Sequence, residues 1–335
     1  MTERFAANIK RSRAAVDEQI LTKYIQNLKK VVDNVPETHI WNLDETNLTD
    51  DPGKVRIICR RGVKYPERIC NFSKSSTSLM ICGSASGEIL PPYVVYKSGQ
   101  LWTTWTEGGP QGCRYSHSKS GWFDAVTYND WFETLLLPRL RMLESKKFVI
   151  ADNLSTHLNI SIFKKYRENN IHFVCLPPNT THLTQLLDVA FFHPTKVAWH
   201  QVLTEWKHTP EGMNCAVLPK QWFPALLKRA LEIIEPNMKK NLKSGFKKCG
   251  IVPCDVSPLV ECIARKEVHQ DELNDSFLEI LNKRAMPNSS GGNEKCLKRR
   301  KIPVSPGKSM SHAMPDSDNA VRVLSLMDKS VKQGE

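Results

Sequence analysis

Three aspartates stand at positions from which their carboxylates could act together. Asp44 follows an apolar-rich run that starts at His39, and Asp152 follows a second such run that starts at Lys147. We expect two buried strands that each end on an aspartate to lie side by side and to bring both carboxylates to one edge of a sheet. Asp188 lies near the start of a predicted helix, from which it can complete the cluster.

Such a cluster is suited to a hard divalent cation. Neighbouring carboxylates repel one another and are costly to desolvate, so a cation is their natural compensation. Oxygen ligands that leave room for water and phosphate favour Mg²⁺ or Mn²⁺. Two such ions activate a water or a 3′-hydroxyl and stabilise a leaving oxygen, which is the chemistry of phosphodiester hydrolysis and strand transfer. Taken singly, each aspartate is more typical of a cap or a turn.

The segments around the acids alternate between strand-like and helical patterns, which is typical of an α/β chain. Strands are predicted at 39–44, 78–83, 90–96, 147–152 and 171–176, with the second and third continuing the sheet antiparallel to the first. Helices are predicted at 14–35, 127–144, 160–169, 186–207 and 221–235. Thr127 is the expected N-cap of its helix, and Pro138 is expected to kink that helix.

Four local segments give the sequence a family resemblance. They are Asn42–Thr46, Ala151–His157, Cys175–Asp188 and Gly245–Pro253. Together they resemble the DDE superfamily endonucleases of the pogo/Tigger/Jerky group of transposases. The resemblance covers about residues 14–255, and the stretch from Leu176-Pro177-Pro178 to Asp188 is its most specific part.

The resemblance implies an RNase-H-like fold, in which a mixed sheet is flanked by helices. It also implies a two-ion Mg²⁺ or Mn²⁺ site at Asp44, Asp152 and Asp188 and a cut-and-paste reaction on DNA. The family carries two helix-turn-helix modules ahead of this core, whereas here only a short helix precedes Asp44. We therefore expect a core that has lost its DNA-end-binding modules and binds DNA weakly and largely without sequence preference.

The sequence departs from the family at four positions near the acids. The family usually has His where Leu154 stands and Pro where Leu186 stands, and small glycines near Ala190 and His193. None of these positions is a metal ligand in the family. A change at any of them can shift the helix that carries Asp188 or remove a contact with substrate.

Composition divides the chain into four predicted parts. Residues 1–13 are polar and are expected to be disordered, and 14–207 form the endonuclease core with its preceding helix. Residues 208–258 form a helical C-terminal extension of that core. Residues 259–335 form a mostly disordered basic tail, where Pro, Ser, Gly, Asn and Lys come to dominate.

The charge balance favours a polyanionic partner. Lys and Arg number 47 against 35 for Asp and Glu, which gives a formal net charge of +12. No signal peptide opens the sequence and no apolar run reaches the roughly 20 residues that span a bilayer, so no membrane association is expected. The ten cysteines form no C-x-x-C pair, which favours a reduced, intracellular protein. The basic cluster Lys298-Arg299-Arg300-Lys301 indicates nuclear import.

Several further residues are candidates for contact with nucleic acid. Lys164, Lys165 and Arg167 could line a DNA path, although a solvated helix face is an equal alternative. His182 and His157 could contact phosphate or metal, and the simpler interpretation is a hydrogen-bonded structural histidine. Glu45 should point away from Asp44, because side chains alternate along a strand.

The sequence leaves two alternatives beside a transposase-derived endonuclease that acts on DNA. One is a domesticated, non-catalytic nuclear protein that binds DNA or regulates through the same fold. The other is an inactive, truncated copy. The intact acids favour the enzyme, and the missing modules favour the alternatives. Assembly into a homo-oligomer is also left open.

Overall fold

A mixed sheet forms the centre of the computed structural model, which describes residues 16–53, 58–63, 71, 73–152 and 160–263. Within these residues its six strands run in the order β4-β3-β2-β1-β5-β6. They are β1 (Ile40–Thr49), β2 (Ser76–Ser84), β3 (Tyr93–Lys97), β4 (Arg114–Ser118), β5 (Lys147–Ala151) and β6 (Ile171–Cys175). The first three strands pair antiparallel, β5 and β6 run parallel to β1, and β4 runs parallel to β3. The predicted RNase-H-like mixed sheet is confirmed.

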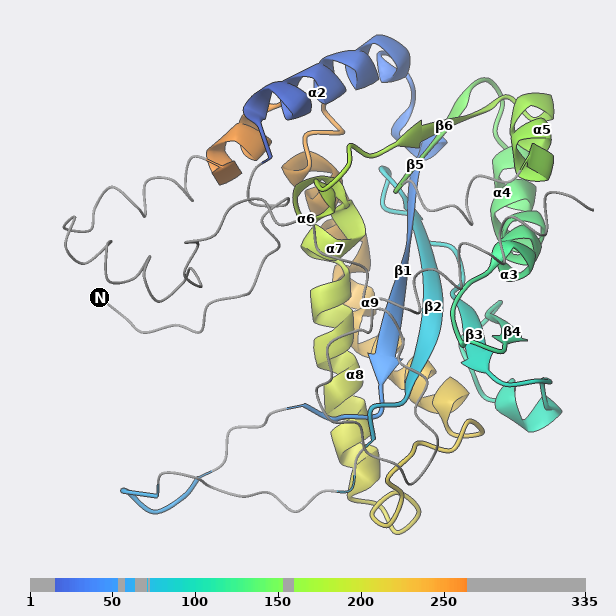
Figure 1. The fold of residues 1–335 in the computed structure, drawn as a ribbon, viewed down its shortest axis with the longest axis vertical. Helices are drawn as coiled ribbons and strands as arrows, with labels where there is room; N and C mark the ends of the chain where they lie inside the picture. The colour runs from blue at the N-terminus through green and yellow to red at the C-terminus, as the bar shows by residue number, and fades with distance from the viewer. Residues whose placement is uncertain (1–15, 54–57, 64–70, 72, 153–159, 264–335) are drawn as a thin grey trace, which may run out of the picture. The chain divides into compact units, whose positions relative to one another are not determined.

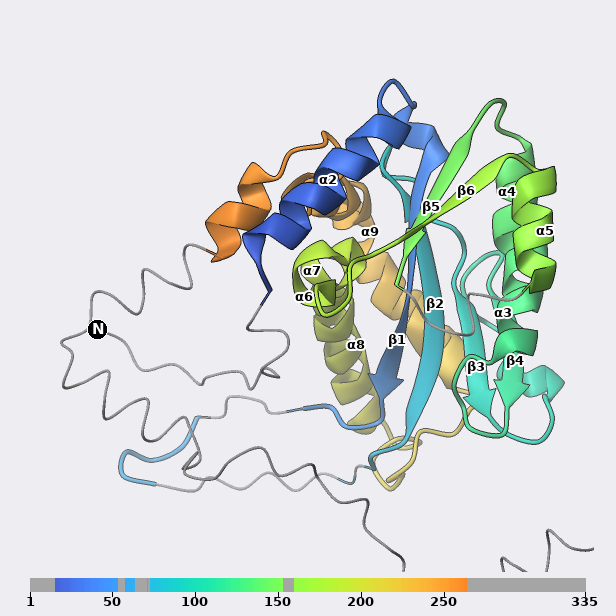
Figure 2. The ribbon, with the colours of Figure 1, turned by 45° about the horizontal axis from the view of Figure 1, so that its top comes forward.

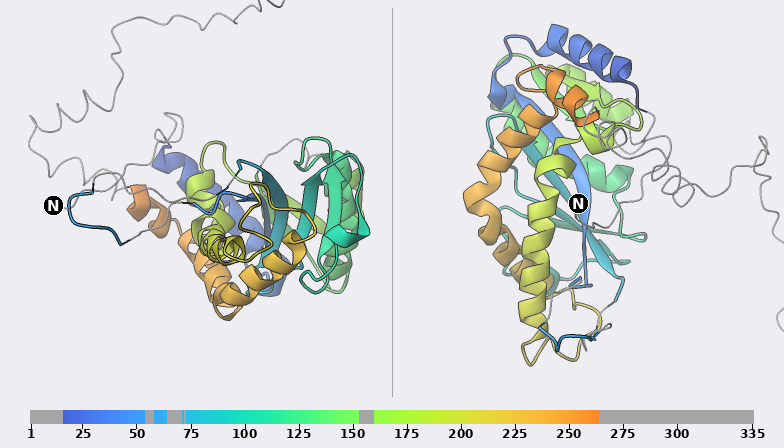
Figure 3. Two further views of the ribbon diagram at one scale, coloured as in Figure 1. Left: turned by 90° about the horizontal axis from the view of Figure 1, so that it is seen from below. Right: turned by 90° about the vertical axis from the view of Figure 1, so that its left-hand side faces the viewer.

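Helices cover both faces of this sheet (Figures 1 and 3). One face packs against α3 (Ala125–Trp131), a π-helical turn (Phe132–Leu136), α4 (Leu137–Arg141) and α5 (Ile160–Glu168). The other packs against α2 (Glu18–Val32), α6 (Thr181–Thr184), α7 (Leu186–Ala190), α8 (Phe192–Lys207) and α9 (Phe223–Lys248). Short 3₁₀ turns occur at Glu37–His39 and Thr103–Trp105. No helix among the described residues has the length and apolar content to cross a membrane.

The alternation of side chains along β1 separates two hydrophobic cores. Trp41 and Leu43 are fully buried in the core beneath α3–α5. Ile40 and Leu48 are buried in the core beneath α6–α9. Because successive residues of a strand point to opposite faces, every even-numbered residue from Ile40 to Leu48 faces α6–α9.

Several predicted boundaries are wrong in an informative way. Asp44 does not end its strand, because β1 continues to Thr49 while it pairs with β2. The predicted helix over 186–207 is broken at Phe191 into α7 and α8. The predicted helix over 221–235 runs on through Pro236 to Lys248 as one helix. Pro236 is exposed, so water can satisfy the carbonyl that the proline leaves without an N–H partner.

The start of α3 corrects a second expectation. Asp124, not Thr127, is the N-cap, and its carboxylate accepts a hydrogen bond from the Thr127 backbone N–H at 2.9 Å. The Thr127 hydroxyl in turn accepts from the Asp124 backbone N–H, which completes a capping box. Pro138 stands in the first turn of α4, directly after the π-helical turn that interrupts the segment.

The described chain reaches beyond the predicted helical extension. Residues 257–263 are helical, and Leu259 is 1% exposed within the core beneath α6–α9. The predicted boundary of the tail at residue 259 therefore falls inside packed structure. Residues 1–13, most of the predicted tail and the cluster Lys298–Lys301 lie outside the described residues, and the division into four parts stays a prediction.

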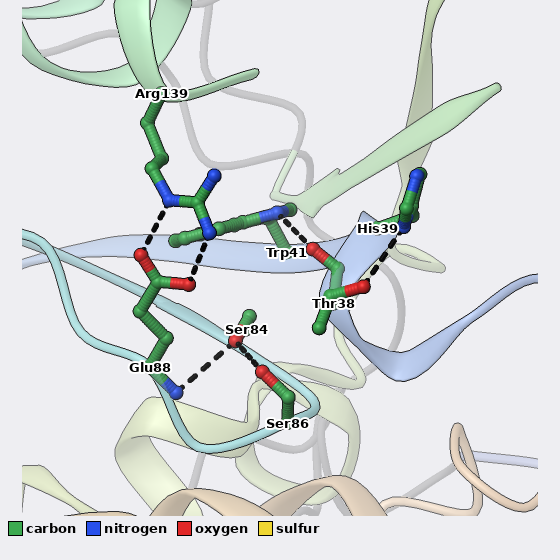
Figure 4. A network of polar contacts seen from close by, with 7 residues as sticks. All are labelled: Thr38, His39, Trp41, Ser84, Ser86, Glu88 and Arg139. Atoms are coloured by element: carbon green, nitrogen blue, oxygen red, sulfur yellow. Dashed lines mark hydrogen bonds and ion pairs between the residues drawn. The ribbon is translucent and has the colours of Figure 1, made fainter. Parts of the chain in front are cut away.

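A network of hydrogen bonds and a cation–π contact connects the start of β1 with the β2–β3 connection and with α4 (Figure 4). Arg139 donates two hydrogen bonds to Glu88, at 2.5 and 2.7 Å, and its guanidinium lies 5.9 Å from the centre of the Trp41 ring. The Trp41 indole N–H donates to the Thr38 carbonyl at 2.9 Å. The backbone N–H of Glu88 donates to the Ser84 hydroxyl, which holds the turn that presents the glutamate. The fork-shaped contact fixes the strand from which Asp44 projects.

Candidate active site

Asp44 and Asp152 come from neighbouring strands at the same level of the sheet. The parallel register of β1 and β5 pairs Ile40 with Phe148 and Asn42 with Ile150. The two strands lie side by side (Figure 2). Asp44 and Asp152 each follow by two positions the last pair that joins the two strands, Asn42 with Ile150. The predicted adjacency of these two chain segments is confirmed.

Both aspartates occur at positions that face α6–α9. Asp44 shares its face of β1 with Ile40 and Leu48, which belong to the core beneath those helices. Ile150 belongs to the same core, so Asp152, two residues later, continues on its side of the chain. Glu45 faces the other way and lies within electrostatic range of Tyr128 in the opposite core, as the alternation predicts.

The helix α7 brings the third aspartate to this face. Leu186 and Leu187 are fully buried and anchor α7, while Asp188 is exposed in its first turn. The contact between α7 and α9 is close because Gly245 has no side chain. A Cβ placed there would lie 3.1 Å from the Leu186 carbonyl oxygen and 3.2 Å from the Ala190 Cβ.

The environment of Asp44 disfavours its charged form. Burial raises the pKa of Asp44 well above its ordinary value, and the negative charges of Asp188 and Asp152 raise it further. A hydrogen bond from the Glu45 backbone N–H, at 2.9 Å, and another from the Gln185 side chain lower that pKa in part. Charge effects of this kind act over short distances, so Asp152 and Asp188 both lie within electrostatic range of Asp44.

The repulsion gives a prediction for stability. Replacing Asp44 with Asn should raise the free energy of unfolding at pH 7.5, in the absence of divalent metal, by about 1 kcal/mol. The folded-state pKa of Asp44 is raised, so its ionisation opposes folding. The stability of the wild type is therefore lost as pH rises from the ordinary value of 3.8 through the raised pKa.

The difference between Asp44→Asn and the wild type should thus shrink as the pH falls towards 4. Urea unfolding in EDTA at a series of pH values measures it. A wild type that is more stable than the variant at pH 7.5 would show that the carboxylates do not repel.

The donor set fits a hard divalent cation by its chemistry. Asp44, whose charged form is disfavoured by burial and by its neighbours, and the carboxylates of Asp152 and Asp188 supply the oxygen ligands and the negative charge that Mg²⁺ and Mn²⁺ select. Among the described residues no three acidic, histidine or cysteine side chains already have the spacing to hold one ion. Residues 153–159, which directly follow Asp152, lie outside that description.

The other predicted contact residues are not gathered at the acids. Lys164, Lys165 and Arg167 lie on α5, which packs against the opposite face of the sheet through Ile162 and Tyr166. Lys165 forms an ion pair with Glu133 of the π-helical turn. The helix therefore does not line the face that carries the aspartates. Their role in nucleic-acid binding stays a prediction.

The structure describes one of the two predicted histidines, His182, and not the other, His157. His182 lies half-buried in α6, on the segment that leads to α7. His157 and the departure at Leu154 fall outside the described residues. The departure at Leu186 is a fully buried residue that packs α7 against the core.

Sequence reasoning missed two polar residues at the acid cluster. Asn42 is fully buried, and its amide donates to the Ile150 carbonyl at 2.8 Å. Gln185 is 1% exposed, and its amide donates to the Leu43 carbonyl at 3.1 Å. Their spacing was a usable signal, because one stands two residues before Asp44 and the other three residues before Asp188.

Comparison with known proteins shows what part of this chain is similar to. The family model described as DDE superfamily endonuclease matches residues 73–234, which include Asp152 and Asp188. "Pogo transposable element with KRAB domain" from Homo sapiens is 24% identical over 198 residues, or 56% of this chain and 30% of that protein. "MFS-type transporter clz9" from Cochliobolus lunatus is 25% identical over 198 residues, or 58% of this chain and 20% of that protein. The chain thus matches less than a third of the length of either relative.

Solved structures of the Mos1 mariner transposase are distantly similar. The paired end complex with Mg has a TM-score of 0.48 and 14% identity, and covers 79% of this chain and 66% of that one. The catalytic domain alone has a TM-score of 0.36 and 11% identity, and covers 72% of this chain and 97% of that one. The family model covers the segment that contains Asp152 and Asp188, and over residues 73–234 the chain is similar to the DDE superfamily endonucleases.

Proposed function

We propose that this chain is a metal-dependent endonuclease core that hydrolyses DNA phosphodiesters and transfers DNA strands. Asp44, Asp152 and Asp188 would hold two Mg²⁺ or Mn²⁺ ions. The proposal is supported by the adjacency of the β1 and β5 segments that carry Asp44 and Asp152, and by the charges of Asp188 and Asp152, which raise the pKa of Asp44.

The chain's own residues would divide the work between positioning and charge. The ions, when bound, supply Lewis acidity for an attacking and a leaving oxygen. The backbone of Asp44 is held by antiparallel pairing with Ile81 of β2, two residues beyond the last pair that joins β1 to β5. Asp188 stands on a short helix that is packed against α9, and its position depends on that contact. No side chain at the cluster needs to act as a covalent nucleophile in this reaction.

The test is nicking of supercoiled plasmid by the purified chain in Mn²⁺, compared with the same reaction in EDTA. Mn²⁺ is the better probe because it tolerates imperfect coordination more readily than Mg²⁺. Slow, Mn²⁺-dependent relaxation of the plasmid supports the enzyme. A chain that binds DNA but neither binds Mn²⁺ nor nicks would favour the domesticated, non-catalytic protein instead.

DNA is the proposed partner, bound mainly through its phosphates. With a net charge of +12, the chain should lose at least about a hundredfold in affinity between 50 and 200 mM salt. Two unrelated duplexes of equal length should bind within about threefold of each other, because phosphate contacts carry no sequence information. Fluorescence anisotropy at several salt concentrations measures both. A footprint on one sequence that survives competitor DNA would contradict this.

We also propose that the chain is nuclear, through the basic cluster Lys298–Lys301. A fusion of residues 283–301 to a cytoplasmic reporter should accumulate in the nucleus. The same fusion with Arg299 and Arg300 changed to Ala should stay cytoplasmic. A wild-type fusion that remains in the cytoplasm would remove this proposal.

A further inference from the structure

Gln185 occupies the junction between two short helices near the acids. It follows α6 and is the N-cap of α7, with extended backbone angles (φ −83°, ψ 99°). Its side chain is 1% exposed, although glutamine is a residue that proteins mostly leave in contact with water. A polar side chain that is buried at this point, three residues before Asp188, requires a specific partner.

The partners of Gln185 are on the strand that carries Asp44. Its Nε2 donates to the Leu43 carbonyl at 3.1 Å, and its side chain lies close enough to the Asp44 carboxylate to lower the pKa of that group. One amide therefore connects the strand of the first aspartate to the helix of the third. A shift of α7 along the sheet would break both contacts.

Asn42 makes the corresponding connection to the second aspartate. It faces the same side of β1 as Asp44 and is fully buried. Its Nδ2 donates to the Ile150 carbonyl of β5 at 2.8 Å, two residues before Asp152. Each pair of neighbouring acid-bearing elements is thus joined by one buried amide.

The amide oxygens of both residues are the second observation. Asn42 Oδ1 and Gln185 Oε1 are buried and have no hydrogen-bond partner among the described residues. Burying an unsatisfied amide oxygen is unfavourable, and in native proteins such a group usually has a ligand, an ion or a water as its explanation. Two acceptors beside a carboxylate cluster suit the O–H groups of water, which Mg²⁺ and Mn²⁺ sites retain.

We propose that Gln185 and Asn42 are positioning residues of the acid site, which hold Asp188 and Asp152 in place relative to Asp44 and accept hydrogen bonds from water in the site. The proposal rests on the metal-binding part of the proposed function. It assigns the two amides a role outside the carboxylate triad. Outer partners of this kind commonly change metal affinity by ten- to a hundredfold when removed.

The experiment measures Mn²⁺ binding, by calorimetry and by electron paramagnetic resonance, in chains with the full sequence. Gln185→Met and Asn42→Leu keep the approximate size of the side chain and remove the amide. Each should raise the Mn²⁺ dissociation constant about tenfold or more. Gln201→Met is the matched control, because Gln201 is exposed on α8 and its amide donates a hydrogen bond to Glu205 of the same helix. Its Mn²⁺ affinity should equal that of the wild type.

A double-variant cycle separates positioning from a general loss of stability. In an Asp188→Asn background the further change Gln185→Met should have less than a third of its effect on Mn²⁺ affinity, because the acid it positions is gone. Equal effects in both backgrounds would overturn the positioning role. If Gln185→Met does not fold, Gln185→Asn keeps the amide but shortens it by one methylene and should show the same weakening.

The outcomes distinguish the two proposals. Wild-type affinity in Gln185→Met and Asn42→Leu, together with lost affinity in Asp152→Asn, overturns this inference and leaves the proposed function intact. A wild-type chain that binds Mn²⁺ no better than Asp152→Asn overturns the proposed function, and the positioning role falls with it.

Discussion

Asp152→Asn is expected to abolish Mn²⁺-dependent nicking, with a loss of at least about a hundredfold in rate. The change removes one negative charge from the cluster at almost constant volume. The neighbouring strand β5 is fully buried over its five residues, so the fold should be unaffected. A loss of rate at unchanged stability therefore reports on the metal site and not on folding.

The conversion of supercoiled to relaxed plasmid, followed over time on gels, measures this rate. Asp33→Asn is the matched control, because it makes the same chemical change on an exposed residue at the end of α2. It should nick as the wild type does. Undiminished nicking by Asp152→Asn would mean that the three carboxylates are not the source of the activity.

Gly250→Ala is expected to lower the free energy of unfolding by about 3 kcal/mol or more. Gly250 follows the cap of α9 with φ +62°, a left-handed conformation that a side chain disfavours. The Ile251 N–H donates to the Phe246 carbonyl and the Gly250 N–H to the Lys247 carbonyl, which together form a Schellman motif. A Cβ at Gly250 would also lie 1.9 Å from the Asp255 carbonyl oxygen, so the following turn would have to move.

Chemical denaturation measures the loss, and Gly62→Ala separates its two causes. Gly62 also has a positive φ, +98°, but an added Cβ would meet nothing within 4 Å. Its replacement should cost only the backbone strain, about 1 kcal/mol. Equal losses in the two variants would show that the contact with Asp255 does not constrain the end of α9.

The sequence predicts which strands lie beside each other at the site, but not how far those strands extend or which residues hold them. Two buried runs that precede Asp44 and Asp152 are detectable by composition, and their adjacency is confirmed because parallel strands of one sheet share an edge. The run beyond Asp44 is polar, Glu45-Thr46-Asn47, so its pairing with β2 is not visible in hydropathy. Hydropathy therefore predicts that the strand ends at Asp44, five residues before its end at Thr49.

Other errors have equally local causes. The break at Phe191 and the continuation through Pro236 depend on packing and on solvent access to a carbonyl, which periodicity does not report. The edge strand β4 is short and only partly buried, so it has no apolar signature. The burial of Gln185 cannot be predicted from the sequence, because a polar residue's type does not indicate that it will be buried.

Because β1 pairs with a strand on each side, insertions and deletions within it have a direct effect on the site. A single-residue insertion or deletion between Asn42 and Asp44 would shift the register by one and turn Asp44 towards Tyr128 on the opposite face. Changes in length between Thr49 and Ser76 leave that register alone, since they fall between two paired strands. Insertions and deletions in the second segment therefore leave Asp44 on its own face of the sheet, whereas those in the first segment remove it from that face.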